Sequence, residues 1–547
     1  MNTTYFKETN PVSLAERYRL EDPEVLALFG SHPAAPGAWE DRAARLDAAA
    51  GRRADPRRVA AAIRDYHRSL PPSDAVDRSL TKLEQEDSLV VVGGQQAGLF
   101  GGALLIYYKA LSVIQAAKEA EQRLSRPVVP VFWIAGEDHD FDEANHANVQ
   151  ASGGEVRRVR IERPEGPRLA VSRTPLTQEQ WASALQELAS QLPDTEFKPG
   201  LLDRLQSHVA DAPSLSLAFA RLLVDWFGGQ GLLLLDADDP NLRTLEGPMF
   251  RELIERNDDL EGALKAGERV VLDKGLSLQA EIAPDSANLF LHHEQGRLLL
   301  HKENGRFIDR RGHVSYSCQE MQQLTADHPD LLSTNALTRP LMQDYLLPVL
   351  AAVLGPSELA YWGILGPAFR EFELSVPLLL PRQSFTFVEA SIVKLLDKYS
   401  LSVQEAIEEW ETRRTQWLGE QDEWQLEEQF LQVKEQFKAL YAPVLDTVSQ
   451  LQPGLAKLAE NNQDKILDQI EYLQSRSSDA IAKRHEASLR QWDRIRQSLT
   501  PLGKPQERVY GTVHFLNRYG PGWLSLWESV PFDANGGHRL VDAAAAI

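Results

Sequence analysis

The stretch that decides the fold is residues 88–102, which read SLVVVGGQQAGLFGG. Its first five residues form an apolar, β-branched run of the kind found in buried strands. A loop rich in glycine follows, and residues 103–121 have the composition of a helix. This order predicts a strand, a glycine-rich loop and a helix.

A second strand is predicted at residues 127–134, which read PVVPVFWI. Two strands joined by a helix form a β–α–β unit, in which the strands are parallel and the connection is right-handed. The remaining predicted strands are 231–236, 358–362 and 376–380, and the predicted helices between them are 215–227, 240–257, 339–354 and 367–373. This alternation predicts an open α/β sheet.

Two stretches interrupt the alternation. Residues 148–214 combine one strand-like run, 156–162, with helices. Residues 262–335 hold short strand-like runs at 269–272, 287–291 and 296–300, separated by turn-forming residues. We expect both stretches to be insertions in the sheet domain, and the second to be a small antiparallel sheet.

Apolar residues in the last third of the chain recur at steps of three and four. The steps run from Leu426 to Leu451 and resume after Pro453 and Gly454. This heptad-like pattern predicts an antiparallel helical hairpin, whose second arm of about 45 residues would be roughly 65 Å long. Such an arm must pair with the first arm, with another subunit, or with both.

The predicted organisation therefore has five kinds of segment. They are a helical lead-in (1–85), three parts of the core (86–147, 215–261 and 336–390), two insertions (148–214 and 262–335), and a helical coiled coil (391–500) followed by a C-terminal segment that docks on the core (501–547).

Composition limits the classes of function. The 547 residues are 43% hydrophobic and 25% charged, as in ordinary globular proteins. A net charge of −21 repels phosphate backbones, which argues against nucleic-acid binding. The single cysteine, Cys318, leaves no disulfide framework and no cysteine-based zinc site. With no signal-peptide pattern and no run of 18 apolar residues, we expect a cytoplasmic protein without a membrane span.

The glycine-rich loop is the first candidate site. Glycines let backbone amides approach a phosphate, and open α/β sheets bind ligands beyond the carboxyl ends of their strands. The binding candidates are Gly94, Gln95, Gln96, Gly98, Gly101, Gly102 and Lys109. The loop matches neither the P-loop nor the dinucleotide-binding motif, and the alternative is a tight turn whose glycines serve packing.

The second candidate is the polar run 136–146, which reads GEDHDFDEANH. The catalytic candidates here are Glu137, Asp138, His139, Asp140 and His146, with Asn145 as a binding candidate. The histidines could stabilise a developing charge, and a carboxylate could accept a proton from an amine. The cluster could also bind a divalent metal, although it lacks a standard ligand spacing, or it could have a purely structural role.

Four further residues have two interpretations each. Asp236 could hold a ribose hydroxyl or an ammonium group, or it could cap the next helix. Arg339 could pair with a substrate carboxylate or form a structural ion pair. Tyr361 and Trp362 could stack on a base or sugar, or fill the core.

Several of these motifs together resemble the BshC family, the cysteine ligases of bacillithiol biosynthesis. The resemblance is carried by residues 94–102 with 109–110, 131–146, 338–348, 360–362 and 515–520, and it extends over essentially the whole chain. One departure is Ala103, which stands where the family pattern has proline after the first loop.

The resemblance implies a Rossmann-like parallel sheet core similar to that of class I aminoacyl-tRNA synthetases and related nucleotidyltransferases. It also implies two connecting-peptide insertions, a coiled-coil domain and a homodimer. The implied reaction joins the carboxyl of cysteine to the amine of glucosaminyl-malate, which gives bacillithiol. A second nucleotide site is implied near the coiled-coil junction, with Ser384, Arg508 and Asn517 as its candidates.

Amide formation from a free carboxylate is uphill in water, so we expect ATP, with Mg²⁺ as its companion, to activate cysteine as an adenylate or an acyl phosphate. We expect the phosphates to lie over residues 94–102 and His139. Glu137, Asp138 or Asp140 would then hold the amines or take the proton, and Arg339 would bind the malyl carboxylates. Two rival hypotheses are a nucleotide-binding coiled-coil scaffold without catalysis, and a metal-dependent hydrolase that uses the cluster from Glu137 to His146.

Overall fold

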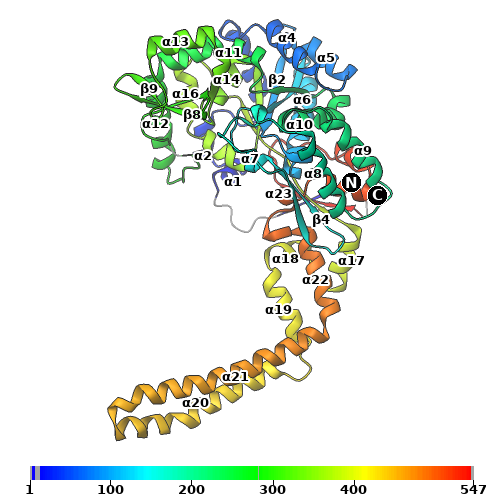
Figure 1. Ribbon diagram of the computed structural model, residues 1–547, viewed down its shortest axis with the longest axis vertical. Helices are drawn as coiled ribbons and strands as arrows, with labels where there is room; N and C mark the ends of the chain where they lie inside the picture. The colour runs from blue at the N-terminus through cyan, green and yellow to red at the C-terminus, as the bar shows by residue number, and fades with distance from the viewer. Residues whose placement is uncertain (1–2, 7–12, 281, 544–547) are drawn as a thin grey trace. The chain divides into compact units, whose positions relative to one another are not determined.

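The computed structural model describes residues 3–6, 13–280 and 282–543 of the chain. The chain forms two compact units (Figure 1). The first comprises Met1–Phe387 and Lys504–Ile547, and the second comprises Val388–Gly503. Among the described residues, no helix is both long and apolar enough to cross a membrane.

The first unit is built on a five-stranded sheet in the order β13-β12-β2-β3-β6. These strands are β13 (Leu378–Pro381), β12 (Val349–Leu354), β2 (Leu89–Gln95), β3 (Val128–Ile134) and β6 (Leu233–Asp236). Every neighbouring pair is parallel, and β2 pairs with β3 along its whole length. The predicted α/β class with a parallel sheet is confirmed.

Both faces of this sheet are buried, as its near-continuous apolar strands require. Val91, Phe132 and Leu234 contribute to one apolar core, together with α6 (Leu104–Leu124) and α10 (Leu215–Phe227). Residues that point the other way, such as Trp133, contribute to a second core. That core includes residues of α4 (Pro56–His67), α5 (Asp74–Leu83), α11 (Pro240–Glu255) and α12 (Asn257–Asp273).

The N-terminal region before β2 is mainly helical, as predicted. Besides α4 and α5 it contains α1 (Leu14–Arg19), α2 (Pro23–Phe29) and α3 (Ala38–Ala48). Its short strand β1 (Thr3–Tyr5) pairs with β15 (His538–Asp542) near the C-terminus, in a three-stranded sheet completed by β14 (Ser384–Val388).

The prediction for residues 339–362 was wrong in two places. The predicted strand 358–362 lies in α15 (Pro356–Trp362), and the predicted helix 339–354 ends early, as α14 (Arg339–Leu346). The fourth strand is β12, all six residues of which are buried. An apolar run without periodicity does not distinguish a buried strand from a buried helix. Pro348 and Pro356 mark the real boundaries, because proline ends a helix or occupies its first turn.

Both insertions contain antiparallel sheets. In the first, β4 (His146–Gln150) pairs with β5 (Val156–Arg160), ahead of α8 (Gln178–Gln191) and α9 (Lys198–Val209). In the second, five strands have the order β10-β9-β8-β7-β11. They are β10 (Ser315–Ser317), β9 (Arg306–Ile308), β8 (Gly296–Glu303), β7 (Ser286–His293) and β11 (Leu332–Thr334). The expected strand at 269–272 is wrong, because those residues belong to α12.

The C-terminal segment belongs to the first unit. It contains α23 (Gln506–Val509), α24 (Thr512–Tyr519) and α25 (Gly522–Glu528) before β15.

The second unit is helical (Figure 1). Its helices α20 (Leu426–Leu451) and α21 (Ala456–Arg484) form the predicted antiparallel hairpin, which turns at Pro453–Leu455. The expected long second arm is interrupted at His485, after which α22 (Glu486–Leu499) begins. Trp492 and Ile495 of α22 pack in a small core with residues of α17 (Ala390–Lys398) and α18 (Val403–Glu408) and with Trp410 of α19 (Trp410–Glu420).

Candidate active site

The carboxyl ends of β2 and β12 meet at a topological switch point. The chain continues from β2 to β3 and β6 on one side, and later adds β12 and β13 on the other side. Ligands of open α/β sheets bind in the crevice outside such a point. Gly94 and Gln95, at the end of β2, are half-buried here.

Lys109 connects the two strand ends. It comes from α6, and its ammonium donates hydrogen bonds to the Gly94 carbonyl oxygen at 2.6 Å and to Gln95 Oε1 at 3.2 Å. It also forms an ion pair with Glu358 of α15, which accepts a hydrogen bond from the Gly355 amide at 2.8 Å. Burial lowers the pKa of Lys109, and the Glu358 carboxylate opposes that shift. The lysine therefore fixes the end of β2 against the start of α15.

Arg339 and Tyr361 lie beside this group. Arg339 donates a hydrogen bond to the Tyr361 hydroxyl at 2.8 Å. Burial disfavours the charged form of Arg339, but Tyr361, Glu358 and Glu137 outweigh it, so the pKa of Arg339 is raised. Trp362 is buried in the core next to Phe369, and a side-chain hydrogen bond joins it to Tyr361.

Glu137 follows β3 and is held in a buried ion pair with Arg243 of α11. It also accepts a hydrogen bond from Thr334 Oγ1 at 2.9 Å. Burial would raise the pKa of Glu137, but the charges of Arg243 and Arg297 outweigh it, and the pKa is lowered. Arg243 pairs in addition with Glu246 at 2.7 Å. This network joins the end of β3 to α11 and to the second insertion.

His139 and Asp138 are both half-exposed. The His139 Nδ1 atom lies 3.5 Å from the Asp138 carboxylate and 3.4 Å from the Arg297 guanidinium. Burial and the Arg297 charge lower the pKa of His139. The imidazole is therefore neutral at pH 7 and can accept a proton. Arg297, on β8, is fixed by hydrogen bonds to Ser333 Oγ at 3.0 Å and to the Thr334 carbonyl oxygen at 2.5 Å.

The other residues of the run have local structural partners. Asp140 is the N-cap of α7 (Phe141–Ala144), where it accepts a hydrogen bond from the Glu143 amide. Asn145 is buried and donates to the Ile161 carbonyl oxygen at 2.8 Å. His146 Nδ1 lies 3.2 Å from the Asp142 carbonyl oxygen.

Asp236 is buried at the end of β6, against Gly136. A Cβ atom at position 136 would lie 2.2 Å from the Asp236 carboxylate, so only glycine fits there. Burial raises the pKa of Asp236 to about 7. The residue that caps α11 is Asp239, not Asp236. Asp238, two residues on from Asp236, accepts two hydrogen bonds from Arg173, at 2.7 and 2.8 Å.

Replacing Asp236 by asparagine is expected to make stability less sensitive to pH. Between an unfolded pKa near 3.8 and a folded pKa of about 7, the folded state holds a proton that the unfolded state lacks, so this contribution to stability falls as pH rises. The free energy of unfolding of Asp236→Asn, relative to that of wild type, should therefore rise by roughly 2–3 kcal/mol from pH 5 to pH 8. Urea denaturation at the two pH values measures this difference.

Asp238→Asn is the matched control for that experiment. Burial would raise the pKa of Asp238, but its bonds to Arg173 and the charge of Arg243 lower it. Its contribution to stability is present above the unfolded pKa near 3.8 and is lost only in stronger acid, so this variant should be destabilised about equally at pH 5 and pH 8. Equal pH dependence in the two variants would contradict the assignment of the raised pKa to Asp236.

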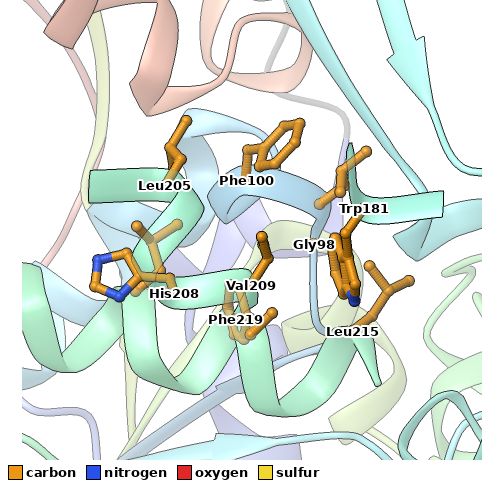
Figure 2. A pocket seen from close by; sticks show the side chains of 11 residues that line it. Gly98, Phe100, Trp181, Leu205, His208, Val209, Leu215 and Phe219 are labelled. Atoms are coloured by element: carbon orange, nitrogen blue, oxygen red, sulfur yellow. The ribbon is translucent and has the colours of Figure 1, made fainter. Parts of the chain in front are cut away.

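The second half of the glycine-rich loop packs against protein. A Cβ atom at Gly101, where φ is +92°, would lie 2.3 Å from Trp226, and one at Gly98 would lie 2.6 Å from the Gly102 Cα atom. Figure 2 shows the pocket beside this half, with Gly98 and Phe100 near apolar side chains such as Trp181 and Phe219. Gln96 is buried and donates to the Asp140 carbonyl oxygen at 2.9 Å. Gly98, Gly101 and Gly102 therefore lie against protein, and a Cβ atom at Gly94 would lie 2.7 Å from the Trp133 carbonyl oxygen, whereas Gln95 is half-buried at the switch point.

The three candidates for a second nucleotide site have separate surroundings. Ser384 Oγ lies 2.7 Å from His538 Nδ1, Asn517 is buried and donates to the Pro193 carbonyl oxygen at 3.0 Å, and Arg508 is exposed. Within the described ranges, no hydrogen bond or ion pair joins any two of them.

Several polar residues of the site were not predicted from the sequence. They are Arg173, Arg243, Arg297, Thr334, Glu358 and the buried pair Arg382–Glu507. Glu358 carried a usable signal, because a glutamate three positions after Gly355, with Pro356 between them, is typical of a helix start. The arginines have no such sequence signal, since each comes from an element distant in sequence from the polar run.

The described carboxylates and histidines of the site contact several different partners and do not converge on one point. Within the part of the chain that the structure describes, no group of three or more His, Cys, Asp or Glu side chains is arranged to hold a metal ion.

The parallel sheet, its switch-point site and the separate helical unit define a Rossmann-like α/β protein with a coiled-coil domain. The chain belongs to the BshC family. The family's model for its "N-terminal Rossmann-like domain" matches residues 1–383, and that for its "C-terminal coiled-coil domain" matches residues 385–543, both described under bacillithiol biosynthesis. The resemblance inferred from the motifs is confirmed, whereas the likeness to class I aminoacyl-tRNA synthetases stays a prediction.

Similar proteins cover nearly the whole chain. The chain is 34% identical to a protein of Bacillus licheniformis, over 92% of this chain and 93% of the relative. It is 35% identical to one of Symbiobacterium thermophilum, over 92% of each, and 33% identical to one of Geobacillus sp. strain WCH70, over 98% and 97%. Each of the three is named "Putative cysteine ligase BshC".

Proposed function

We propose that the protein is a ligase that joins the carboxyl of cysteine to the amine of glucosaminyl-malate and so forms bacillithiol. The relatives named as cysteine ligases, which match along the whole chain, support the reaction class. The observation that carries the proposal is the half-exposed imidazole of His139, which follows β3 and lies within 3.5 Å of both Asp138 and Arg297.

This arrangement suits amide formation. The attacking amine must lose a proton, and a half-exposed neutral imidazole with a lowered pKa can take it as a general base. Asp138, beside the ring, stabilises the imidazolium that results. Arg339, whose pKa is raised, stays charged and can bind the malyl carboxylates through two parallel hydrogen bonds.

ATP is the proposed activator of the cysteine carboxylate, through an adenylate or an acyl phosphate. We place its phosphates beside Gly94 and Gln95, because these two residues are half-buried at the carboxyl end of β2, whereas residues 98–101 are buried. Mg²⁺ bound with a nucleotide needs only one or two carboxylates besides phosphate oxygens, and the half-exposed Asp138 fits that requirement. Because the reaction uses ATP and a free thiol, we propose a cytoplasmic location.

The test is a product assay by mass spectrometry. Pure protein is incubated with cysteine, glucosaminyl-malate, ATP and magnesium, and each component is omitted in turn. Bacillithiol should appear only in the complete mixture, and release of AMP or ADP would identify the activated intermediate. Absence of the product in every mixture would contradict the proposal and favour the scaffold hypothesis. The hydrolase hypothesis has no support from the donor geometry, because Glu137 pairs with Arg243 and Asp140 caps a helix.

We also propose a homodimer formed through the coiled coil. Lys434–Glu471 and Tyr441–Asn462 contacts mark the face of α20 that meets α21. A different face carries an apolar stripe, spaced by seven, four and seven residues, whose members are 48–80% exposed. The stripe consists of Val433, Leu440, Val444 and Leu451. Heptad-spaced apolar residues of this kind pack against a further helix.

Leu440→Glu is expected to convert the dimer to a monomer, because it places a charge in the centre of the stripe. Light scattering coupled to size-exclusion chromatography should give twice the chain mass of 61.3 kDa for wild type and the chain mass for the variant. Ala442→Glu is the matched control, since Ala442 is exposed on the opposite side of the helix and receives the same charge. A monomeric wild type, or equal effects of the two variants, would contradict the proposed interface.

A further inference from the structure

A cavity of about 230 Å³ lies at the opposite end of the strands from the candidate active site. Its wall includes Leu378, the first residue of β13. It also includes Arg42, which donates hydrogen bonds to the carbonyl oxygen of Val349, the first residue of β12. Leu378 and Val349 lie at the amino ends of β13 and β12, whereas the candidate active site lies at the carboxyl ends of the strands.

Three arginines line this cavity. Arg42 and Arg45 come from α3, and Arg370 comes from α16 (Gly366–Glu371). Arg370 folds back over Gly366, where its guanidinium lies 3.6 Å from the position that a Cβ atom would take. The remaining lining is apolar or small and, as far as the described residues go, contains no carboxylate.

The positive charge around the cavity is not balanced. Arg42 is buried and pairs with Asp344 at 2.6 Å, but Arg53 pairs with the same carboxylate at 2.9 Å. One carboxylate therefore serves two guanidinium groups. Arg45 and Arg370 are exposed, and in the described ranges neither makes a hydrogen bond or ion pair through its side chain. Burial lowers the pKa of Arg42, and the nearby charges of Arg53 and Arg45 lower it further.

A protein with a net charge of −21 has no general reason to gather unpaired arginines around a hollow. Guanidinium groups recognise carboxylates and phosphates through paired hydrogen bonds. The volume of about 230 Å³ is smaller than that of pockets which hold drug-sized ligands, roughly 300–1,000 Å³, and this favours a compact anion.

We propose that this cavity is a second ligand site, which binds a small anion with two or more carboxylate or phosphate groups between Arg45 and Arg370. Leu28 and Phe29 line the cavity and also pack against Gly363, the residue that ends α15. Two residues of the cavity wall therefore lie against the C-terminal end of α15, the helix that carries Glu358 and Tyr361.

Isothermal titration of the full-length protein with citrate, and separately with inorganic phosphate, tests the site. Wild type should bind at least one of them saturably, and the better probe shows whether carboxylate or phosphate is preferred. The double variant Arg45→Gln/Arg370→Gln should weaken that binding at least tenfold. The control Arg57→Gln/Arg78→Gln removes the same charge from exposed positions elsewhere and should change the binding less than twofold.

Arg339→Gln separates this site from the switch point. Because Arg339 lies in the candidate active site, the variant should keep the binding that Arg45→Gln/Arg370→Gln loses. Three outcomes would overturn the proposal: no saturable binding of either probe up to 10 mM, equal effects of the two double variants, or loss of the binding in Arg339→Gln. Thermal unfolding of each variant without ligand confirms that the substitutions leave the fold intact, since both arginines are exposed.

Discussion

Arg243→Met is expected to lower the free energy of unfolding by roughly 3–5 kcal/mol, because it leaves buried carboxylates without their counter-charge. The Arg243 side chain is 0% exposed and pairs with Glu137 and Glu246, and Asp238 lies 3.8 Å away. Methionine fills a similar volume, so the loss measures the electrostatic role more than a cavity. Urea denaturation at pH 8 gives the value.

The pH dependence of this variant has a definite sign. The pKa of Glu246 is already raised to about 7 by burial, even with Arg243 beside it. Without the arginine, the buried carboxylates take up protons more readily in the folded state, so the destabilisation should be smaller at pH 5 than at pH 8. Arg256→Met is the control, since its ion pairs with Glu252 and Glu371 are partly exposed and should contribute less than about 1 kcal/mol. A similar loss in both variants, or a loss that does not change with pH, would contradict this account.

The Arg243 network also shows why the core of the fold could be predicted and the site only in part. Strands β2, β3 and β6 and the helices between them follow from runs of apolar residues bounded by glycine and polar residues, and those patterns are local. Strand β12 was missed because a fully buried run of six residues has no periodicity to distinguish strand from helix.

The site depends on partners that local patterns do not specify. The sequence singled out residues 136–146, and the structure places Glu137, Asp138 and His139 at the end of β3. It could not indicate that Glu137 pairs with an arginine 106 positions later, or that His139 lies against an arginine from the second insertion. Ion pairs between distant elements are fixed by the tertiary fold. The sequence of a polar run therefore does not distinguish a solvent-exposed carboxylate from one that is held in a buried ion pair.

The glycine-rich loop illustrates the same limit. Glycines that admit a ligand and glycines that admit a neighbouring side chain give the same sequence. Gly101 makes way for Trp226 of α10, a residue 125 positions away, and a Cβ atom at Gly94 would lie 2.7 Å from the carbonyl oxygen of Trp133 in the neighbouring strand β3. Both contacts come from elements distant in sequence, so the pattern of the loop alone does not reveal them.

His139→Ala is expected to reduce kcat for bacillithiol formation by about 10²–10⁴-fold, because the variant lacks the group that we propose takes the proton from the amine. Since burial and Arg297 lower the pKa of His139, wild-type activity should be constant above the ordinary histidine range and fall only at more acidic pH, where the ring becomes protonated. The variant should lose that acidic limb, and added imidazole should restore part of the rate. Steady-state assays of product formation from pH 5 to pH 8.5 measure all three effects.

His146→Ala is the matched control, because His146 is a half-exposed histidine of the same polar run whose ring lies beside the Asp142 carbonyl oxygen. It should change kcat less than threefold, and thermal unfolding of both variants should stay within a few degrees of wild type. If His139→Ala kept kcat within fivefold of wild type, the proton would have another acceptor, and the imidazole beside Asp138 and Arg297 would serve to position the loop. If kcat fell but the acidic limb persisted and imidazole restored nothing, the loss would reflect altered binding rather than proton transfer. The general-base role therefore requires the loss of rate, the loss of the limb and the rescue together.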